Sequence, residues 1–260
     1  MHDEAGVPQG DSGLPSLNPT TRFSDRAADY VQYRPGYPSA AMDAVLAGLP
    51  ASPLVADVGA GTGISSRAVA DRGVRVIAVE PNPEMRAAAA AHPRVEWRDG
   101  TAEATGLDVA SIDLVLCAQA FHWFRVRESI AEFHRVLRAR GRLVLLWNSR
   151  SRTDPLTFDY ITAIHAVNGE HPAEQRAVPI TEIDALGLFT PLSVERFDHS
   201  QRLDRSGLLG RAVSASYVPK TGEAFERLSR LLDEAFDRHR DGTGHVTMRY
   251  VTEVWRAERR

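Results

Sequence analysis

Cysteine and lysine are scarce in this chain of 260 residues, which has a single cysteine, Cys117, and a single lysine, Lys220. One cysteine excludes an intramolecular disulfide and makes a cysteine-ligated zinc site implausible. Lys220 lies far from every motif described below, so it is a poor candidate for a catalytic lysine. Cys117 falls in an apolar run, where we expect it to be a small buried hydrophobic residue.

The chain also lacks an apolar run of 18 residues and a long basic run. Nothing is therefore expected to span a membrane. The formal net charge of −3 argues against a nucleic-acid or membrane-surface partner. The N-terminal segment MHDEAGVPQGDSGLPS has neither the basic flank nor the apolar stretch of a secretory signal. We expect a cytoplasmic protein, and the sequence does not indicate its oligomeric state.

The chain is expected to divide into a flexible tail over 1–22 and one domain over 23–260. Within that domain, residues 23–38 combine aromatic side chains with an arginine and with Pro35, Gly36 and Pro38. This composition predicts a short helix followed by a bend. The segment lies next to a loose tail and has no obvious helical face, so we interpret it as a lid that orders over a ligand.

Short apolar runs alternate with helical patterns over the middle of the chain. The pattern N-P-E at 82–84 predicts a helix start, with alanines continuing to residue 91. A second helix is predicted over 127–140, ended by Gly141. Strands separated by helices indicate a parallel sheet covered on both faces. The runs predicted as strands are LVADVGA (54–60), VRVIAVE (74–80), RVEWRDG (94–100), IDLVLCAQ (112–119) and RLVLLWN (142–148).

The last third of the chain is less regular. A strand is predicted near 192–198, a helical pair at 206–217 and 221–239, and a final strand at 245–255, where apolar residues alternate. The final strand would close the parallel sheet in the antiparallel direction. The helical pair would then form a cap insertion over about 200–245.

The segment D-V-G-A-G-T-G at 57–63 follows the first apolar run and precedes a helix. Its glycines allow a tight turn and a ligand close to the main chain, although ordinary turns also use glycine. Glu80 ends the second run, where an acid commonly binds both hydroxyls of a ribose. Together the two features indicate a ligand that contains adenosine.

Two observations disfavour a dinucleotide as that ligand. Counted from Gly59, the sixth position of the fingerprint is Ile64 instead of a small residue. Asp57 stands two residues before the first glycine, where its charge would repel a pyrophosphate and would suit a cationic amino group. No P-loop motif and no G-x-S-x-G nucleophile elbow is present.

These motifs resemble those of the class I S-adenosylmethionine-dependent methyltransferases. VADVGAGTG and VIAVEPNPEM look like motifs I and II, and the region 100–124 is similar to the family's fourth strand and its surroundings. The R-P-G-Y-P arm, the A-F-H-W-F run and the W-N-S-R end of the fifth strand resemble a small-molecule branch that includes trans-aconitate methyltransferase-like enzymes. The resemblance implies a Rossmann-like, mostly parallel seven-stranded sheet with an antiparallel last strand, and a cofactor-binding half over 50–150.

The resemblance also implies roles for individual residues. Asp57 would hold the amino group of the cofactor, Glu80 the ribose hydroxyls and Arg34 the methionine carboxylate. Thr101 stands where the family often has an acid, so its contact to adenine would be weaker. The residues implied in binding S-adenosylmethionine are Tyr30, Arg34, Asp57, Gly59, Gly61, Gly63, Glu80, Pro81, Thr101, Ala102, Ala118 and Gln119.

Three aromatic residues and a histidine, F-H-W-F at 121–124, follow the fourth strand. Aromatic faces near a sulfonium gain from cation–π attraction, but they could equally pack the next helix. His122 is the one plausible acid or base here, while Trp123 and Trp147 are candidates for the substrate pocket. Cations for an anionic substrate could come from Arg34, Arg125 and Arg150.

The sequence therefore predicts an enzyme that methylates a small organic molecule at a carboxylate or another O, N or C nucleophile. No metal is expected. Glu170 and His171, with His165 six residues upstream, could contact a metal, but no third ligand stands at a fitting spacing. Three alternatives stay open. They are a nucleic-acid methyltransferase, which A-Q-A-F-H-W after the fourth strand disfavours; a nicotinamide-dependent oxidoreductase; and an S-adenosylmethionine-binding protein without transfer activity.

Overall fold

The computed structural model describes residues 31–170, 178–215 and 217–260. Its centre is a seven-stranded sheet with the order β3-β2-β1-β4-β5-β7-β6. The first five strands are parallel, and β7 runs antiparallel to both β5 and β6. The strands are β1 (Leu54–Val58), β2 (Arg75–Val79), β3 (Val95–Arg98), β4 (Ile112–Ala118), β5 (Leu137–Arg150), β6 (Ser193–Leu203) and β7 (Val246–Glu258). The predicted fold class and the antiparallel last strand are confirmed.

Helices cover both faces of the sheet, as the near-continuous apolar strands require. Successive residues of β4 alternate between two cores: Leu114 and Leu116 belong to one, Val115 and Cys117 to the other. The first core includes residues of α2 (Ser39–Leu46) and α3 (Ile64–Ala70). The second includes residues of α5 (Val126–Val136) and α7 (Ile180–Ala185). Cys117 is buried, as the sequence predicts.

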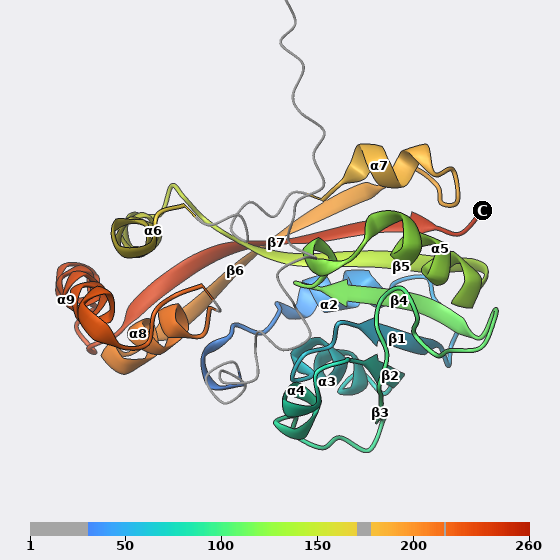
Figure 1. Ribbon diagram of the computed structural model, residues 1–260, viewed down its shortest axis with the longest axis horizontal. Helices are drawn as coiled ribbons and strands as arrows, with labels where there is room; N and C mark the ends of the chain where they lie inside the picture. The colour runs from blue at the N-terminus through green and yellow to red at the C-terminus, as the bar shows by residue number, and fades with distance from the viewer. Residues whose placement is uncertain (1–30, 171–177, 216) are drawn as a thin grey trace, which may run out of the picture.

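Three more helices gather at the far ends of β6 and β7, away from α3 and α4 (Figure 1). They are α6 (Pro155–Asn168), α8 (Arg205–Val213) and α9 (Gly222–His239). Their apolar residues form a separate core with Val246, Met248 and Tyr250 of β7. The sequence predicts α8 and α9 but misses α6. Its start was visible in principle, because Asp154 caps the helix through Thr157 N at 2.9 Å and Pro155 follows.

Two predicted helices are shorter than expected. The helix predicted over 127–140 ends at Val136, because Leu137 already pairs with Ile112 in the sheet. Gly141 does not end it; the left-handed residue is Arg140, with φ 62°. The alanine helix, α4 (Pro83–Ala87), stops four residues early. Met85 is its one buried residue, so the later alanines have no apolar contact to stabilise another turn.

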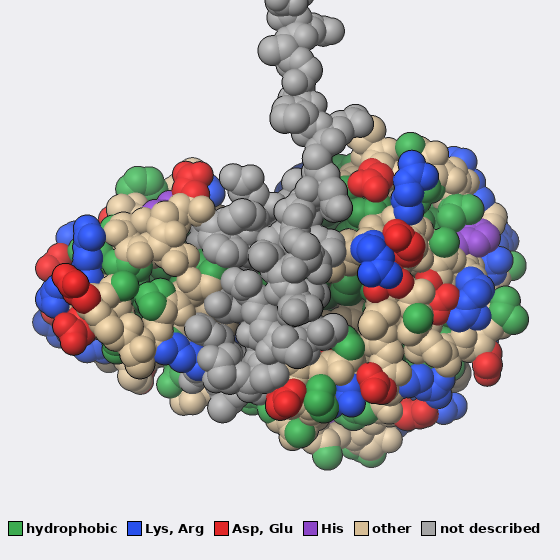
Figure 2. All heavy atoms as spheres, viewed as in Figure 1, with side chains coloured by type: hydrophobic (Ala, Val, Ile, Leu, Met, Phe, Trp, Pro, Cys, Tyr) green, Lys and Arg blue, Asp and Glu red, His purple; other side chains and the backbone are tan. Residues whose placement is uncertain are grey.

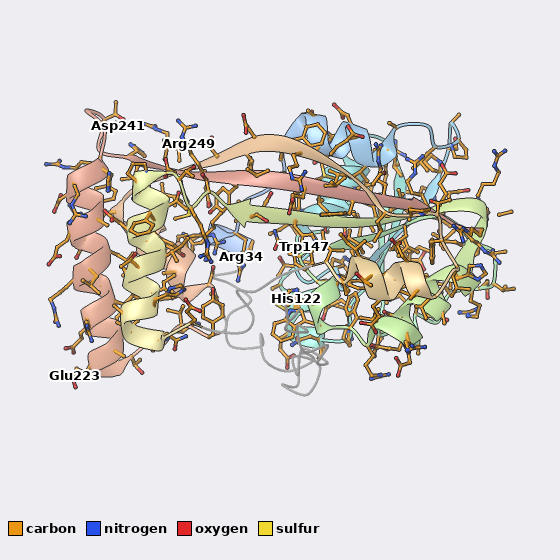
Figure 3. The ribbon with its side chains drawn as sticks, turned by 90° about the horizontal axis from the view of Figure 1, so that it is seen from above. Arg34, His122, Trp147, Glu223, Asp241 and Arg249 are labelled. Atoms are coloured by element: carbon orange, nitrogen blue, oxygen red, sulfur yellow. The ribbon has the colours of Figure 1, made fainter. Side chains whose placement is uncertain are left out.

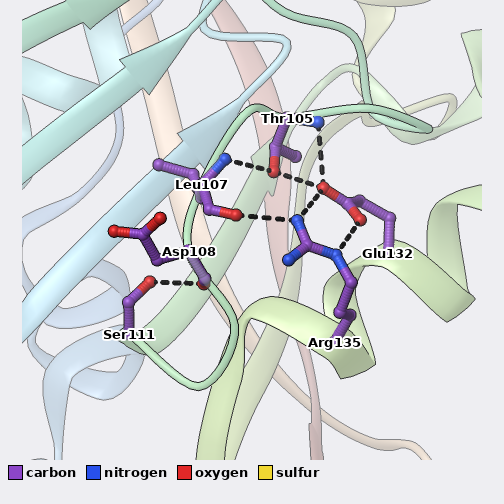
Figure 4. A network of polar contacts seen from close by, with 6 residues as sticks. All are labelled: Thr105, Leu107, Asp108, Ser111, Glu132 and Arg135. Carbon is purple, nitrogen blue, oxygen red and sulfur yellow. Dashed lines mark hydrogen bonds and ion pairs between the residues drawn. The ribbon is translucent and has the colours of Figure 1, made fainter.

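A polar network ties the loop between β3 and β4 to α5 (Figure 4). Glu132 accepts hydrogen bonds from Thr105 N at 3.0 Å and from the guanidinium of Arg135, which also donates to the carbonyl oxygen of Leu107 at 2.7 Å. Burial would raise the pKa of Glu132, but the hydrogen bonds from Arg135 and Thr105 outweigh it and lower the pKa. The loop that carries Thr101 and Ala102 is therefore anchored to the core.

The described residues contain no helix long and apolar enough to cross a membrane. On the visible face, acidic and basic side chains are interspersed at both ends of the molecule (Figure 2). This face carries no large patch of one sign, in agreement with the small net charge.

Candidate active site

The glycine loop follows β1 at the carboxyl end of the parallel strands, where open α/β sheets bind ligands. Gly59, Gly61 and Gly63 have φ values of 70°, 58° and 76°. At Gly59 a Cβ atom would lie 2.7 Å from Cβ of Ala120 and 2.9 Å from the ring of Phe124. This position therefore needs glycine for space as well as for conformation.

Glu80 directly follows β2 and faces this loop. Its Oε2 accepts from Gly61 N at 2.8 Å and its Oε1 from Asn82 N at 2.9 Å. Burial raises the pKa of Glu80, and the two backbone donors only partly oppose this. Each carboxylate oxygen keeps a second lone pair, so the group can still accept two hydroxyl hydrogen bonds.

Asp57 lies beneath the loop and is fully buried. Its Oδ2 accepts from Ser65 Oγ at 2.7 Å and from Ser66 Oγ at 2.6 Å, both on α3. Burial raises the pKa of Asp57 to about 6, although the serine hydrogen bonds lower it. Oδ1 has no hydrogen-bond partner among the described residues. A buried carboxylate oxygen without a donor would be satisfied by a cationic or N–H group of a ligand.

The described part of the predicted arm, residues 31–38, contacts β5, α8 and the residue that follows α8. Arg34 donates to the carbonyl oxygen of Ser214 at 3.0 Å, and Asn148 Nδ2 donates to that of Gly36 at 2.9 Å. The ring of Tyr33 lies so close to α8 that a Cβ on Gly210 would be 2.5 Å from it. Tyr30 and the first half of the predicted lid, 23–30, lie outside the described residues.

Two cavities meet between the glycine loop and the helices α6 and α8. The smaller, about 30 Å³, is bordered by Arg34, Gly59, Ala60, Ser65, Ala118 and Gln119. The larger, about 230 Å³, is bordered by Trp147, Arg150, Arg152, Ile161 and Tyr217. Asn148 and Arg211 line both, so they mark the junction. The structure thus brings four predicted cofactor residues together beside a second space large enough for a small molecule.

Of the other predicted site residues, Gln119 borders the smaller cavity, and His122 lies against Trp147 of the larger one. Gln119 takes a left-handed conformation, with φ 57°, directly after β4. Ala102 is buried in the core, while Thr101 and Pro81 are partly exposed. The ring of His122 lies 4.7 Å from that of Trp123 and 5.2 Å from that of Trp147. In Figure 3, His122 and Trp147 lie close together near the middle of the molecule, and Arg34 lies from there toward α6 and α9.

Arg125, one of the predicted cations, lies outside the site, and the sequence prediction missed two residues that line it. Arg125 is exposed and pairs with Glu128 at 3.3 Å, outside both cavities. Arg211 and Tyr217 were not singled out from the sequence. Arg211 follows buried Leu208 by three residues on α8 and is itself buried. An arginine on the apolar side of a short helix was the available signal.

The comparisons with known proteins agree with this geometry. Residues 56–145 match the family described as "Methyltransferase domain". An uncharacterized methyltransferase of Mycobacterium tuberculosis is 44% identical over 129 residues, which are 49% of this chain and 52% of that protein. The chain spans about half the length of the curated relatives it matches.

Solved structures extend the likeness beyond that region. A protein described as a type II methyltransferase of Anaeromyxobacter dehalogenans superimposes with a TM-score of 0.65 at 24% identity, covering 87% of this chain and 98% of that one. One from Anabaena variabilis, described as a methyltransferase of an antibiotic biosynthesis pathway, gives a TM-score of 0.58 at 25% identity, covering 82% and 95%. The first of these shows that the fold recurs outside this chain.

Proposed function

We propose that the chain transfers a methyl group from S-adenosylmethionine to a small organic molecule, because residues 56–145 match the family described as "Methyltransferase domain". The observation that carries the proposal is the hydrogen bond between the glycine loop and Glu80, with buried Asp57 held by α3 directly before that loop, beside two adjoining cavities. The Anabaena protein's description supports a small acceptor, as does the volume of that cavity. The arm and aromatic motifs favour a branch similar to trans-aconitate methyltransferases.

The residues present fit this cofactor. The unpartnered Oδ1 of Asp57 suits a cationic amino group, and the free lone pairs of Glu80 suit the two ribose hydroxyls. Gly59, Ala118 and Gln119 border the smaller cavity, where the main chain can approach a ligand closely. Arg34 borders the same cavity and would hold a carboxylate through a charge-assisted hydrogen bond.

When bound, S-adenosylmethionine supplies a methyl group on a positively charged sulfur. The chain's main task is then to align the acceptor with that methyl group and to exclude water. The strand ends at Ala118 and Asn148 fix one side of the junction, and Arg211 of α8 closes the other. We assign residues 31–38 to the lid and α6, α8 and α9 to the substrate cap. A general base is needed only if the acceptor starts protonated.

A transfer assay tests this proposal. The protein is incubated with S-adenosylmethionine that carries a labelled methyl group, over a panel of small acids, phenols, amines and amides. Mass detection of a labelled product, lost in an Asp57→Asn or Glu80→Ala variant, would support methyl transfer. Tight binding of S-adenosylhomocysteine without transfer to any acceptor would favour the second candidate, an S-adenosylmethionine-binding protein of the same fold.

A further inference from the structure

Three arginines border the larger cavity, and two of them, Arg150 and Arg211, are at least partly buried. Arg150 extends from the end of β5 and Arg211 from α8. Arg211 is only 4% exposed, and its hydrogen bonds go to neutral groups, Tyr250 Oη at 3.3 Å and Ser214 Oγ at 3.4 Å. Within the described part of the chain, neither guanidinium forms an ion pair with a carboxylate. A buried cation without a counter-charge is costly unless a ligand supplies one.

The surroundings of Arg150 keep it charged. The side chain is partly exposed because it borders the cavity, whereas its Nε is enclosed and has no hydrogen-bond partner among the described residues. Its guanidinium carbon lies 5.1 Å from the centre of the Tyr160 ring. Burial would lower the pKa of Arg150, but the oxygens of Tyr160, Tyr217 and Tyr250 outweigh it and raise the pKa. The Tyr160 hydroxyl is buried and has no hydrogen-bond partner in the described residues.

We propose that Arg150, with Arg211 beside it, binds an oxyanion of the acceptor molecule, a carboxylate or a phosphate. This inference rests on the proposed function, because it assigns the larger cavity to the acceptor. An arginine fork binds such groups in bidentate fashion and more strongly than neutral donors do. The tyrosine hydroxyls are further donors within the same surroundings.

The oxyanion is the group by which the protein holds the acceptor molecule, which we call the handle. It is not the atom that receives the methyl group. An oxygen whose lone pairs are engaged by a guanidinium and whose charge is neutralised is a weak nucleophile. Asn148 lines both cavities and lies two residues before Arg150 on β5. Two residues of a strand span about 7 Å, so the accepting atom should lie about that far from the oxyanion. The acceptor is then a bifunctional small molecule.

A binding experiment tests the handle directly. Inorganic phosphate and succinate are titrated into the protein by calorimetry, with and without saturating S-adenosylhomocysteine. Phosphate and succinate identify the two possible handles, and binding of either supports the site. Arg150→Gln should weaken that binding at least about tenfold, while Arg152→Gln, an exposed arginine on the same cavity, should weaken it less than about threefold.

Two further variants keep the test decisive. Arg150→Lys keeps the positive charge but loses the paired N–H donors of the guanidinium, so it should weaken anion binding less than Arg150→Gln does. This variant keeps the test available even if the Gln variant does not fold. Tyr160→Phe removes the buried hydroxyl and should leave S-adenosylhomocysteine affinity unchanged. Absence of phosphate and succinate binding, or equal losses in Arg150→Gln and Arg152→Gln, would overturn the inference. If the wild-type protein does not bind S-adenosylhomocysteine at all, that result would instead contradict the proposed function.

A turnover experiment tests the distinction between handle and acceptor. Once a methylated acid is identified, its matched amide is compared with it. Arg150→Gln should raise KM for the acid far more than it lowers kcat, and should leave the amide's kcat/KM nearly unchanged. A methyl ester formed on the oxyanion itself would overturn the handle assignment.

Discussion

The backbone N–H of Gly61 donates a 2.8 Å hydrogen bond to Oε2 of Glu80. This contact joins the glycine loop after β1 to the acid after β2, so the two motifs are held together in the fold. The same carboxylate accepts from Asn82 N through its other oxygen. Glu80 is thereby held in place before any ligand arrives, which lowers the cost of ordering it on binding.

Glu80→Ala should weaken the binding of S-adenosylhomocysteine at least about tenfold, because hydrogen bonds to a charged group contribute about 1.5–3 kcal/mol each. Calorimetry measures the affinity, and circular dichroism checks the fold. Glu96→Ala is the control, since Glu96 is exposed on β3 and pairs with Arg98. An affinity that does not change in Glu80→Ala would show that the ribose is held elsewhere.

Asp57 should lower the free energy of unfolding as the pH rises from about 4 to about 6. The unfolded chain ionises this carboxyl near pH 3.8, whereas burial in the folded protein raises its pKa to about 6. The folded state therefore holds more protons in this window, and the free energy of unfolding decreases as pH rises, by about 3 kcal/mol in total. Denaturant unfolding at several pH values should show that slope in the wild-type protein and lose it in Asp57→Asn. Parallel profiles for the two proteins would contradict a raised pKa.

Gly59→Ala should destabilise the protein more than Gly73→Ala. Both glycines have positive φ values, 70° and 83°, so both substitutions incur the same conformational strain. Only at Gly59 would the added Cβ collide, with Ala120 and Phe124. Overpacking of this kind costs about 1–3 kcal/mol, measured as the difference in the free energy of unfolding in urea. Equal losses would indicate that the loop can move away from Phe124.

The arm over residues 31–38 should be released by Gly210→Ala. Alanine is the better helix former by about 1 kcal/mol, so α8 itself should be stabilised, but its Cβ would lie 2.5 Å from the ring of Tyr33. Hydrogen exchange at 31–38 should become faster, and S-adenosylhomocysteine should slow it less than in the wild-type protein. Gly242→Ala is the control, because that Cβ meets no neighbour within 4 Å. Equally slow exchange with and without ligand in the wild-type protein would argue against a lid.

His122→Ala should lower the methyl-transfer rate by less than about tenfold. Its ring packs at a tilt against the rings of Trp123 and Trp147, so we expect it to shape the pocket wall. Trp123→Ala should cost more through lost shape, since Trp123 also packs on the core of the cap. If His122 were the general base, its loss would cost about 10²–10⁴-fold and remove a limb near neutral pH from the rate profile.

The sheet was predictable because four of its five parallel strands contain a clear apolar run, and β3, V-E-W-R, follows the turn signal His92-Pro93. The glycine loop and Glu80 were predictable for the same reason, since the carboxyl ends of neighbouring parallel strands meet at one edge. The length of α4 was not, because alanine propensity alone does not stabilise a helix that buries only Met85.

The acceptor side of the site was harder to predict. Arg150 and Arg211 are 61 positions apart in sequence and converge only because β5 leads into the cap while α8 returns to it. Tyr160 lies on α6, a helix that the sequence pattern missed. Side chains that only tertiary packing brings together form no motif of fixed spacing in the sequence, so the larger cavity could be recognised only in the structure.

The most direct test of the account is a calorimetric titration of the protein with S-adenosylhomocysteine and, separately, with a nicotinamide dinucleotide. The glycine loop, Asp57 and Glu80 predict a micromolar or tighter Kd for S-adenosylhomocysteine, about −8 kcal/mol, and no tight binding of the dinucleotide. Tight binding of the dinucleotide with none of S-adenosylhomocysteine would contradict the account.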